Sequence, residues 1–275
     1  MINLIVVILS LISTSALYVF NVLSFSSIAS YFLPIAIFSG FFIGWEIIYI
    51  AYLYITSLFI NPHKEYKEVS KYHKFTLDST LKWILSWGRA KVIISSKEKF
   101  PKENCLIVSN HRSNFDPICI GANFTSPHIC FISKLSNLKI PIAGNYIHRN
   151  LYMGIDRENP KNAVKTINKA VSLMLEKGYS IGVYPEGTRN KENKGLLDFK
   201  PGCFKIALKS HKPIVVFTCV NALSVHKNAP FRRTIINLDL IKVIEYEEYK
   251  DMQASEISNY VRALMEENLA KYDEK

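Results

Sequence analysis

The first 60 residues constrain the fold most, because they contain a single charged side chain, Glu46. Residues 1–23 are uncharged and long enough to cross a bilayer, which takes about 20 apolar residues. Residues 28–60 form a second apolar run, and residues 24–27 are typical of a short turn between the two runs. We therefore expect the chain to begin with two helices placed in a membrane.

A secretory signal peptide is the alternative for residues 1–23, but the basic start and the small-residue cleavage site of such peptides are missing. Seven Lys and Arg residues follow between residues 64 and 91, and this bias predicts that they lie on the cytoplasmic side. The two helices of residues 1–60 then form a hairpin in the cell membrane. The sequence leaves open whether the hairpin spans the bilayer or lies in one leaflet.

Residues 61–90 are predicted to link the hairpin to a folded domain. Within residues 64–87, apolar side chains recur at helical spacing with lysines elsewhere; they are Leu77, Leu81, Ile84 and Leu85. Such an amphipathic helix lies on anionic lipid in some proteins and packs on a protein core in others, and both interpretations stay open.

Residues 91–275 alternate between short apolar runs and amphipathic segments. The best-marked segment is the helix expected at residues 160–177, which begins with a proline and ends before Gly178. Strands are expected at residues 92–94, 106–108, 129–132, 180–184, 214–219 and 235–244, and further helices at residues 201–210 and 255–272. This alternation predicts an α/β domain with a mixed sheet covered by helices, preceded by the two-helix membrane hairpin.

Charge and cysteine content exclude several classes of protein. The net charge is +11, and residues 61–275 carry 34 Lys and Arg against 22 Asp and Glu. No zinc-finger or RNA-binding signature accompanies this charge, so an anionic membrane or a phosphorylated substrate is favoured over nucleic acid. The five cysteines are odd in number and form no C-x-x-C, which predicts reduced thiols and no metal site.

Residues 110–116 (NHRSNFD) place an imidazole and a carboxylate on the turn after an expected buried strand. Asp116 precedes a proline and is expected to cap a helix, where its charge meets the positive end of the helix dipole. If the turn brings Asp116 back to His111, the carboxylate accepts one ring N–H and makes the other nitrogen more basic. A base without a nucleophile of its own suits a substrate that brings a hydroxyl. The alternative is an ordinary polar turn with a solvated histidine.

Residues 184–190 (YPEGTRN) follow another expected strand and form a second polar cluster. Gly187 allows the backbone to approach a ligand closely, and Thr188 and Arg189 suit a phosphate group. Glu186 is expected to orient Arg189 or to bond a substrate hydroxyl. The alternative is a polar turn with a surface ion pair.

Two further cations lie near expected strand or helix ends. Arg157 precedes the helix of residues 160–177, whose N-terminus also attracts anions. Lys134 follows the strand of residues 129–132 and is a candidate phosphate contact, with a solvated surface lysine as the alternative.

The ordered set of motifs resembles the glycerolipid acyltransferases, specifically the 1-acylglycerol-3-phosphate acyltransferase family. The similar segments are residues 110–116, 155–157, 184–189, 199–204 (FKPGCF) and 212–216 (KPIVV). The chain departs from the family pattern at Leu151 and Gly154, at the missing acid after Lys134, and at Phe217 and Thr218, where a second proline is usual. The resemblance covers roughly residues 85–250, the region in which an α/β domain is expected.

The resemblance implies a membrane-bound acyltransferase of phospholipid biosynthesis. It would move a fatty acyl group from acyl-CoA or acyl carrier protein to the free hydroxyl of 1-acylglycerol-3-phosphate, giving phosphatidic acid. His111 would be the general base and Asp116 its orienting partner, while the phosphate side would be held by Arg157, Glu186, Gly187, Thr188, Arg189 and Lys134.

The implied partners are membrane lipid, a lysophospholipid acceptor and the acyl donor, with no metal, no other cofactor and no nucleic acid. The catalytic domain would then comprise residues 91–275 on the cytoplasmic side of the cell membrane. Two alternatives stay open: an acyltransferase for another lysophospholipid or an amino-acid lipid, and an inactive membrane-anchored lipid-binding protein.

Overall fold

The computed structural model describes residues 2–20, 22–23, 31–156, 160–190, 192 and 195–273. The chain divides into two compact units, Met1–Lys64 and Glu65–Lys275. Residues 24–27, which were expected to form the turn between the apolar helices, lie outside the described residues.

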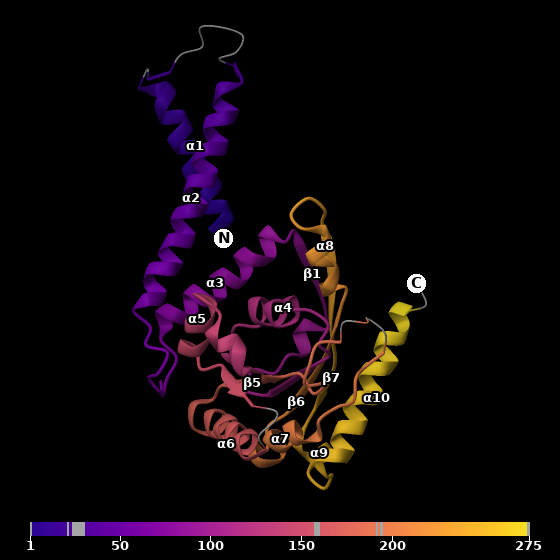
Figure 1. The fold of residues 1–275 in the computed structure, drawn as a ribbon. Coiled ribbons are helices and arrows are strands. Elements are labelled where there is room, and N and C mark those ends of the chain that lie inside the picture. The colour runs from indigo at the N-terminus through magenta and orange to yellow at the C-terminus, as the bar shows by residue number, and fades with distance from the viewer. Residues whose placement is uncertain are drawn as a thin grey trace. The chain divides into compact units, whose positions relative to one another are not determined.

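The first unit consists of two apolar helices, α1 (Ile2–Val19) and α2 (Leu33–Leu58), which pack against each other (Figure 1). Both are long and apolar enough to cross a membrane by length and composition. Few of their side chains are buried, which distinguishes them from the core helices of a soluble domain. Glu46 is one of the buried side chains of α2.

The second unit is built around a seven-stranded sheet with the strand order β1-β7-β6-β2-β5-β3-β4. The strands from β6 to β4 run parallel to one another, whereas β7 is antiparallel to β6 and parallel to β1. The sheet is therefore mixed, as predicted. The strands are β1 (Ala90–Ser95), β2 (Leu106–Ser109), β3 (Ile129–Lys134), β4 (Met153–Ile155), β5 (Ser180–Val183), β6 (Ile214–Val220) and β7 (Thr234–Ile244).

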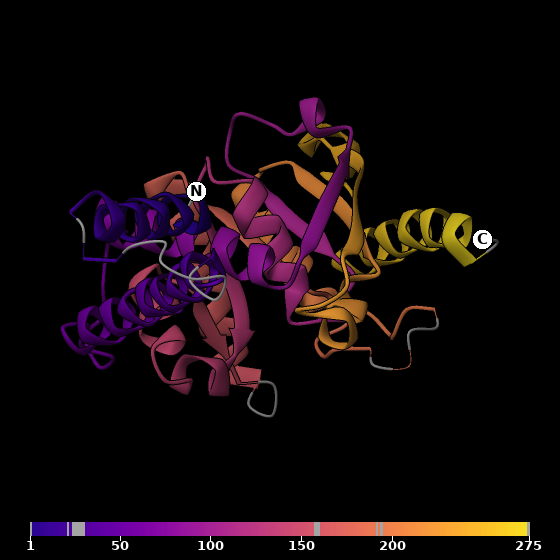
Figure 2. The same cartoon turned by 90° about the horizontal axis from the view of Figure 1, so that it is seen from above.

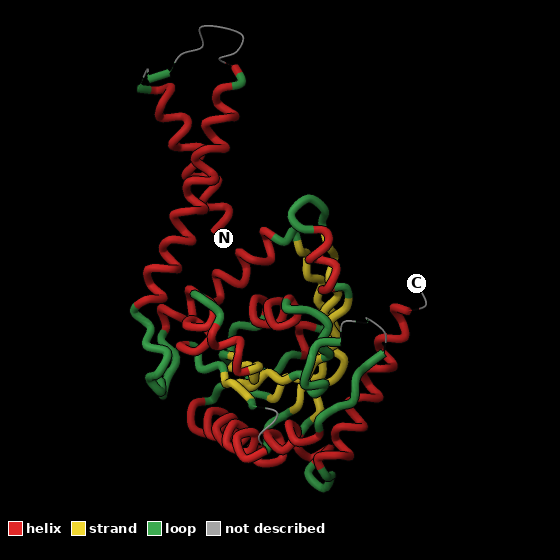
Figure 3. The backbone as a smooth tube through the Cα atoms, viewed as in Figure 1, coloured by secondary structure: helices red, strands yellow, loops and turns green. Residues whose placement is uncertain are grey.

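Helices cover both faces of this sheet, and Figure 3 shows the strands between them. One face packs against α6 (Pro160–Lys177), α7 (Lys205–Ser210) and α10 (Ala254–Asp273), and the other against α3 (Lys71–Trp87), α4 (Phe115–Asn123) and α8 (Val225–Asn228) (Figures 1 and 2). The remaining helices are α5 (Ala143–Arg149), α9 (Tyr246–Tyr249) and the 3₁₀ turns η2 (Lys97–Lys99), η3 (Leu135–Lys139), η4 (Pro201–Phe204) and η5 (Ala222–Ser224).

A hydrophobic core lies on each face of the sheet, and alternate residues of the same strands belong to one core or the other. Val108 of β2 enters the core beneath α6 and α10, whereas Ile107 enters the core beneath α3 and α4. Successive side chains of a strand point to opposite faces, so a strand covered on both faces is a continuous apolar run. This is why residues 106–108 were recognisable as a buried strand.

Most expected elements lie close to their predicted bounds, and β6, β7, α6 and α10 agree within two residues. The helix expected at residues 64–87 begins only at Lys71, and the one expected at residues 201–210 starts as the 3₁₀ turn η4. Leu81 and Leu85 of α3 face the core, while a lipid contact by the rest of that helix stays a prediction. The short elements β4 and α5 were missed, because a few residues do not display a period.

The loops that carry residues 110–116 and 184–190 lie at one edge of the sheet. The strands β2, β5, β3 and β4 are parallel, so their carboxyl ends lie at the same edge. The starts of β7 and β1 also lie there, because β7 is antiparallel to β6. We call this the carboxyl edge; in open α/β sheets it is the usual place for ligands.

Candidate active site

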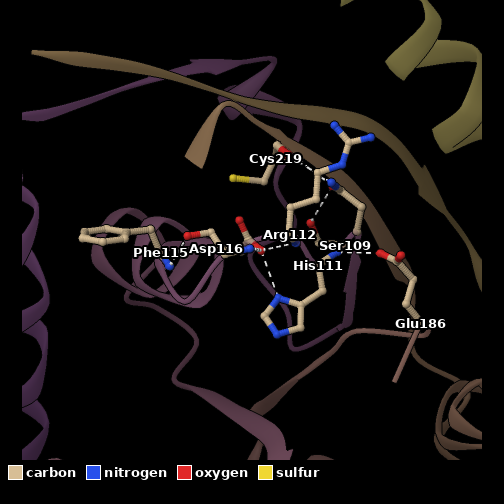
Figure 4. A network of polar contacts seen from close by, with 9 residues as sticks. Ser109, His111, Arg112, Phe115, Asp116, Glu186 and Cys219 are labelled. Carbon is tan, nitrogen blue, oxygen red and sulfur yellow. Dashed lines mark hydrogen bonds and ion pairs between the residues drawn. The ribbon is translucent and has the colours of Figure 1, made fainter. Parts of the chain in front are cut away.

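His111 lies in the loop between β2 and α4, and its imidazole meets the carboxylate of Asp116 (Figure 4). The distance from His111 Nδ1 to Asp116 Oδ2 is 2.9 Å. The same oxygen accepts the backbone N–H groups of Arg112 and Ser113, each at 2.7 Å. An oxygen that accepts two amide protons acts as an acceptor for Nδ1–H as well, which leaves the lone pair on Nε2.

The predicted cap position of Asp116 is wrong by two residues. Helix α4 begins at Phe115 with Asn114 at the N-cap position, so Asp116 lies inside the first turn. Its carboxylate turns back to the preceding loop, where the amides of Arg112 and Ser113 have no partner in the helix. The charge still lies near the positive end of the helix dipole, as predicted.

Tyr184, the residue after β5, supports the face of the imidazole. The rings of His111 and Tyr184 are stacked, with centroids 4.2 Å apart and an interplanar angle of 22°. Tyr184 in turn lies nearly parallel to Phe131 of β3, at 6.2 Å and 11°. Burial and the neighbouring Asp116 raise the pKa of Tyr184 well above its ordinary value, so this ring is neutral. The His111 side chain keeps 17% of its surface exposed, which leaves it open to a substrate.

Glu186 joins two loops of the site. Its Oε1 accepts the backbone N–H of His111 at 2.6 Å, and its Oε2 accepts that of Leu197 at 3.0 Å. Burial raises the pKa of this carboxyl, and the two amide hydrogen bonds act in the opposite direction. Within the described part of the chain its carboxylate has these partners and not Arg189, so the expected pairing with Arg189 is wrong. Contact with a substrate hydroxyl stays a prediction.

Two asparagines hold the His111 loop against other segments, and sequence reasoning missed both. Asn110 donates to the backbone carbonyl of Cys219 at 3.0 Å and accepts the N–H of the same residue at 2.7 Å. The backbone N–H of Asn190 donates to the carbonyl of His111 at 2.7 Å. An amide side chain directly after a buried strand was the one available signal for Asn110, because it can pair with both groups of a neighbouring strand.

The candidate phosphate contacts that the structure describes lie at the same carboxyl edge. Thr188 and Arg189 are exposed in the loop after β5, and Lys134 is exposed at the end of β3. Gly187 has φ of +71°, a conformation that favours glycine, and its N–H bonds the carbonyl of Tyr184 at 3.0 Å. Arg157 lies outside the described residues. Binding of a phosphate by any of these residues stays a prediction.

The chemistry that this arrangement offers is general-base catalysis by His111. Its side chain is partly exposed and its Nδ1 is held by a carboxylate, which is the geometry of a positioned base. The described residues contain no group of three His, Cys, Asp or Glu side chains able to hold a metal ion.

Comparison with known proteins identifies the family. A family model described as Acyltransferase matches residues 91–220, which contain both motif loops. The 1-acyl-sn-glycerol-3-phosphate acyltransferase of Salmonella typhimurium is 32% identical over 171 residues, covering 62% of this chain and 69% of that protein. The chain belongs to the 1-acyl-sn-glycerol-3-phosphate acyltransferase family. It is an O-acyltransferase, and the family resemblance drawn from the motifs is confirmed.

One further relative and one solved structure are similar to this chain. The Escherichia coli protein of the same name is 29% identical over 173 residues, with the same coverage of both chains. The crystal structure of the 1-acyl-sn-glycerophosphate (LPA) acyltransferase PlsC from Thermotoga maritima superimposes with a TM-score of 0.62 at 21% identity. That match covers 83% of this chain and 90% of the Thermotoga chain, and it confirms the predicted fold class.

Proposed function

We propose that this chain is a membrane-bound enzyme that acylates the free hydroxyl of 1-acylglycerol-3-phosphate, giving phosphatidic acid, with acyl-CoA or acyl carrier protein as donor. The observation that carries the proposal is the 2.9 Å contact between His111 Nδ1 and Asp116 Oδ2 at the carboxyl edge. The names of the Salmonella and Escherichia relatives support the acceptor. The two apolar helices support the membrane location, because lysolipid and product both reside in the bilayer.

In this reaction Nε2 of His111 removes the acceptor's hydroxyl proton as the oxygen attacks the thioester carbonyl carbon. The C–S bond of the tetrahedral intermediate then breaks, and the departing thiolate takes the proton from the imidazolium. Asp116 keeps Nδ1 protonated and stabilises the imidazolium. Because the acceptor hydroxyl attacks the thioester directly, no acyl-enzyme is needed. General-base catalysis contributes about 10²–10⁴ in rate, and holding both substrates contributes up to about 7–11 kcal/mol.

The acceptor phosphate is proposed to bind at the loops after β3, β4 and β5. The residues proposed to hold it are Lys134, Arg157, Gly187, Thr188 and Arg189. Glu186 is proposed to act indirectly, since its carboxylate holds the backbone N–H of His111. The catalytic unit is proposed to lie on the cytoplasmic side, where soluble acyl donors are available.

The test compares wild type with His111→Ala in membranes given labelled acyl donor and lysophosphatidic acid. Wild type is expected to form labelled phosphatidic acid, and His111→Ala to be at least about 100-fold slower with unchanged membrane retention and thermal stability. A His111→Ala variant as active as wild type would contradict the proposed role of His111 as general base. A wild type that forms no phosphatidic acid with either donor would remove the acceptor assignment.

The departure from the family pattern at Leu151 and Gly154 favours testing a second class of acceptor. Other lysophospholipids and amino-acid lipids belong in the same assay. If one of them is acylated faster than lysophosphatidic acid and the activity still requires His111, the mechanism stands with a different acceptor.

A further inference from the structure

One surface of the second unit combines cations with exposed aromatic and aliphatic side chains, and the proposed reaction does not use it. Two segments form it: the junction of α3 with β1, and the loop between α8 and β7. They are joined by hydrogen bonds from Thr234 N to the Arg89 carbonyl, 3.1 Å, and from the Arg89 guanidinium to the Phe231 carbonyl, 2.9 Å. We call it the basic–aromatic surface; its members are Trp87, Arg89, Lys91, Ile93, Phe231, Arg232, Arg233 and Ile235.

The apolar members of this surface are exposed, and Phe231 is the most exposed of them. Phe231 keeps 84% of its surface exposed at the tip of its loop, directly before two arginines. Ile93 and Ile235 are also exposed, on the neighbouring strands β1 and β7. Exposed apolar side chains that gather in one region of a folded domain are typical of an interaction surface.

The charge of the surface has one sign. Residues 82–95 and 221–238 together contain six Lys and Arg and no Asp or Glu. Arg89, Lys91 and Arg233 line an open cavity of about 360 Å³, beside Leu85 and Ala90. None of these three cations forms an ion pair within the described residues. Three unneutralised cations around one cavity suit the phosphate of an anionic headgroup.

The surface shares the carboxyl edge of the sheet with His111. Strand β7 begins at this edge, since Asn237 near its start pairs with Val220 at the end of β6. Helix α8, which precedes the loop to β7, contacts α4, because the rings of His226 in α8 and Phe115 in α4 lie 5.3 Å apart. A flat partner on this surface would therefore lie beside the loop that carries the catalytic base.

We propose that the basic–aromatic surface docks the catalytic unit onto an anionic bilayer. Its cations meet lipid phosphates, and Phe231 enters the boundary between headgroups and acyl chains. Lys and Arg residues beside an exposed aromatic ring are typical of surfaces that bind membranes peripherally. Each Lys or Arg near an anionic membrane adds to the electrostatic attraction. The inference rests on the proposed function only in placing the acceptor in the bilayer.

Hydrogen–deuterium exchange tests the docking with the full chain in lipid nanodiscs, without acyl donor or lysolipid. Discs of phosphatidylcholine are compared with discs that also contain phosphatidylglycerol. The amides of residues 231–235 are expected to exchange more slowly in the anionic discs, and high salt is expected to remove the difference because it screens the charges. Equal exchange in both kinds of disc would overturn the proposal.

Variants make the test specific. Arg232→Glu/Arg233→Glu is expected to abolish the protection, and Phe231→Ala, which keeps every charge, to weaken it. The matched control is Lys99→Glu/Lys102→Glu, two exposed lysines after β1 at the opposite edge of the sheet, which is expected to keep the protection. Loss of protection in the control, or full protection in the charge-reversed variant, would contradict the docking.

Activity separates this inference from the proposed function. Arg232→Glu/Arg233→Glu is expected to lose at least about tenfold in rate on anionic vesicles and to match wild type with a short-chain acceptor in neutral detergent micelles. A rate lowered equally in both settings would overturn the proposal. Exchange protection in a chain that forms no phosphatidic acid would retain the docking and remove the acceptor assignment.

Discussion

At the scale of single residues, one oxygen of Asp116 organises the site. Its Oδ2 accepts Nδ1–H of His111 and two backbone amides of the same loop. The carboxylate therefore holds both the imidazole of His111 and the backbone of the loop that carries it. These two roles separate in different substitutions of Asp116.

Asp116→Asn keeps an acceptor for the amides of Arg112 and Ser113 but loses the charge that stabilises the imidazolium. We expect its kcat to fall by at least about 100-fold with little change in thermal stability. Asp116→Ala should lose as much activity and also leave two buried amides without an acceptor, at about 1–3 kcal/mol each. Activity and thermal unfolding in detergent distinguish the two, and equal stability of both variants would contradict this account.

The hydroxyl of Tyr184 is buried without a hydrogen-bond partner in the described part of the chain. We therefore expect Tyr184 to act through its ring, which stacks on His111. Tyr184→Phe keeps the stack on His111 and removes a group that is unfavourable when unsatisfied, so activity should be kept and stability should not fall. Tyr184→Leu removes the flat ring, and we expect kcat to fall by about 10- to 100-fold with KM little changed. A Tyr184→Leu enzyme with wild-type kcat would show that the stack does not position the base.

The pH dependence of stability tests the environment of Glu186. Burial raises its pKa above the ordinary 4.5, so the folded chain holds this proton more tightly than the unfolded chain. Its contribution to stability therefore falls as pH rises from about 4.5 through the raised pKa. Glu186→Gln lacks this titration. As pH rises over that interval, the unfolding free energy of wild type should therefore fall relative to that of Glu186→Gln. A pH-independent difference between the two proteins would contradict the raised pKa.

At the scale of elements, the packing of β3 on β5 supports the active-site rings. Phe131 of β3 lies opposite Gly182 of β5, and a Cβ at Gly182 would overlap two carbons of the Phe131 ring. The missing side chain thus makes room for Phe131, which stacks on Tyr184, which stacks on His111.

Gly182→Ala should therefore disturb both stability and catalysis. Overpacking of this kind costs about 1–3 kcal/mol of unfolding free energy, and displacement of Phe131 should lower kcat through Tyr184. The control is Gly202→Ala, where an added Cβ meets nothing within 4 Å. Thermal unfolding and activity are measured for both, and a Gly182→Ala enzyme as stable as Gly202→Ala would contradict the packing argument.

At the scale of the whole molecule, the two units have different surface chemistry. The first exposes two long apolar helices, and the second exposes a basic surface beside its carboxyl edge. Insertion of apolar helices does not depend on salt, whereas electrostatic docking does. The two proposed kinds of membrane contact are thus separable by experiment.

We expect the full chain to stay with membranes after high-salt and alkaline carbonate washes and to be released by detergent. Arg232→Glu/Arg233→Glu should be retained equally, because its apolar helices are unchanged. Fractionation and immunoblotting check both proteins. Release of the wild type by salt alone would contradict membrane insertion of the first unit.

The sequence by itself determined the features that short segments encode. Continuous apolar runs predicted the buried strands, end signals predicted α6, and the five-residue spacing of His111 and Asp116 predicted the contact between imidazole and carboxylate. Only the tertiary structure decided which distant groups meet. Glu186 bonds a backbone amide 75 residues away, and Asn110 bonds Cys219 109 residues away. These contacts depend on β2 lying between β5 and β6, and strand order is set by packing of the whole sheet, which no local pattern records.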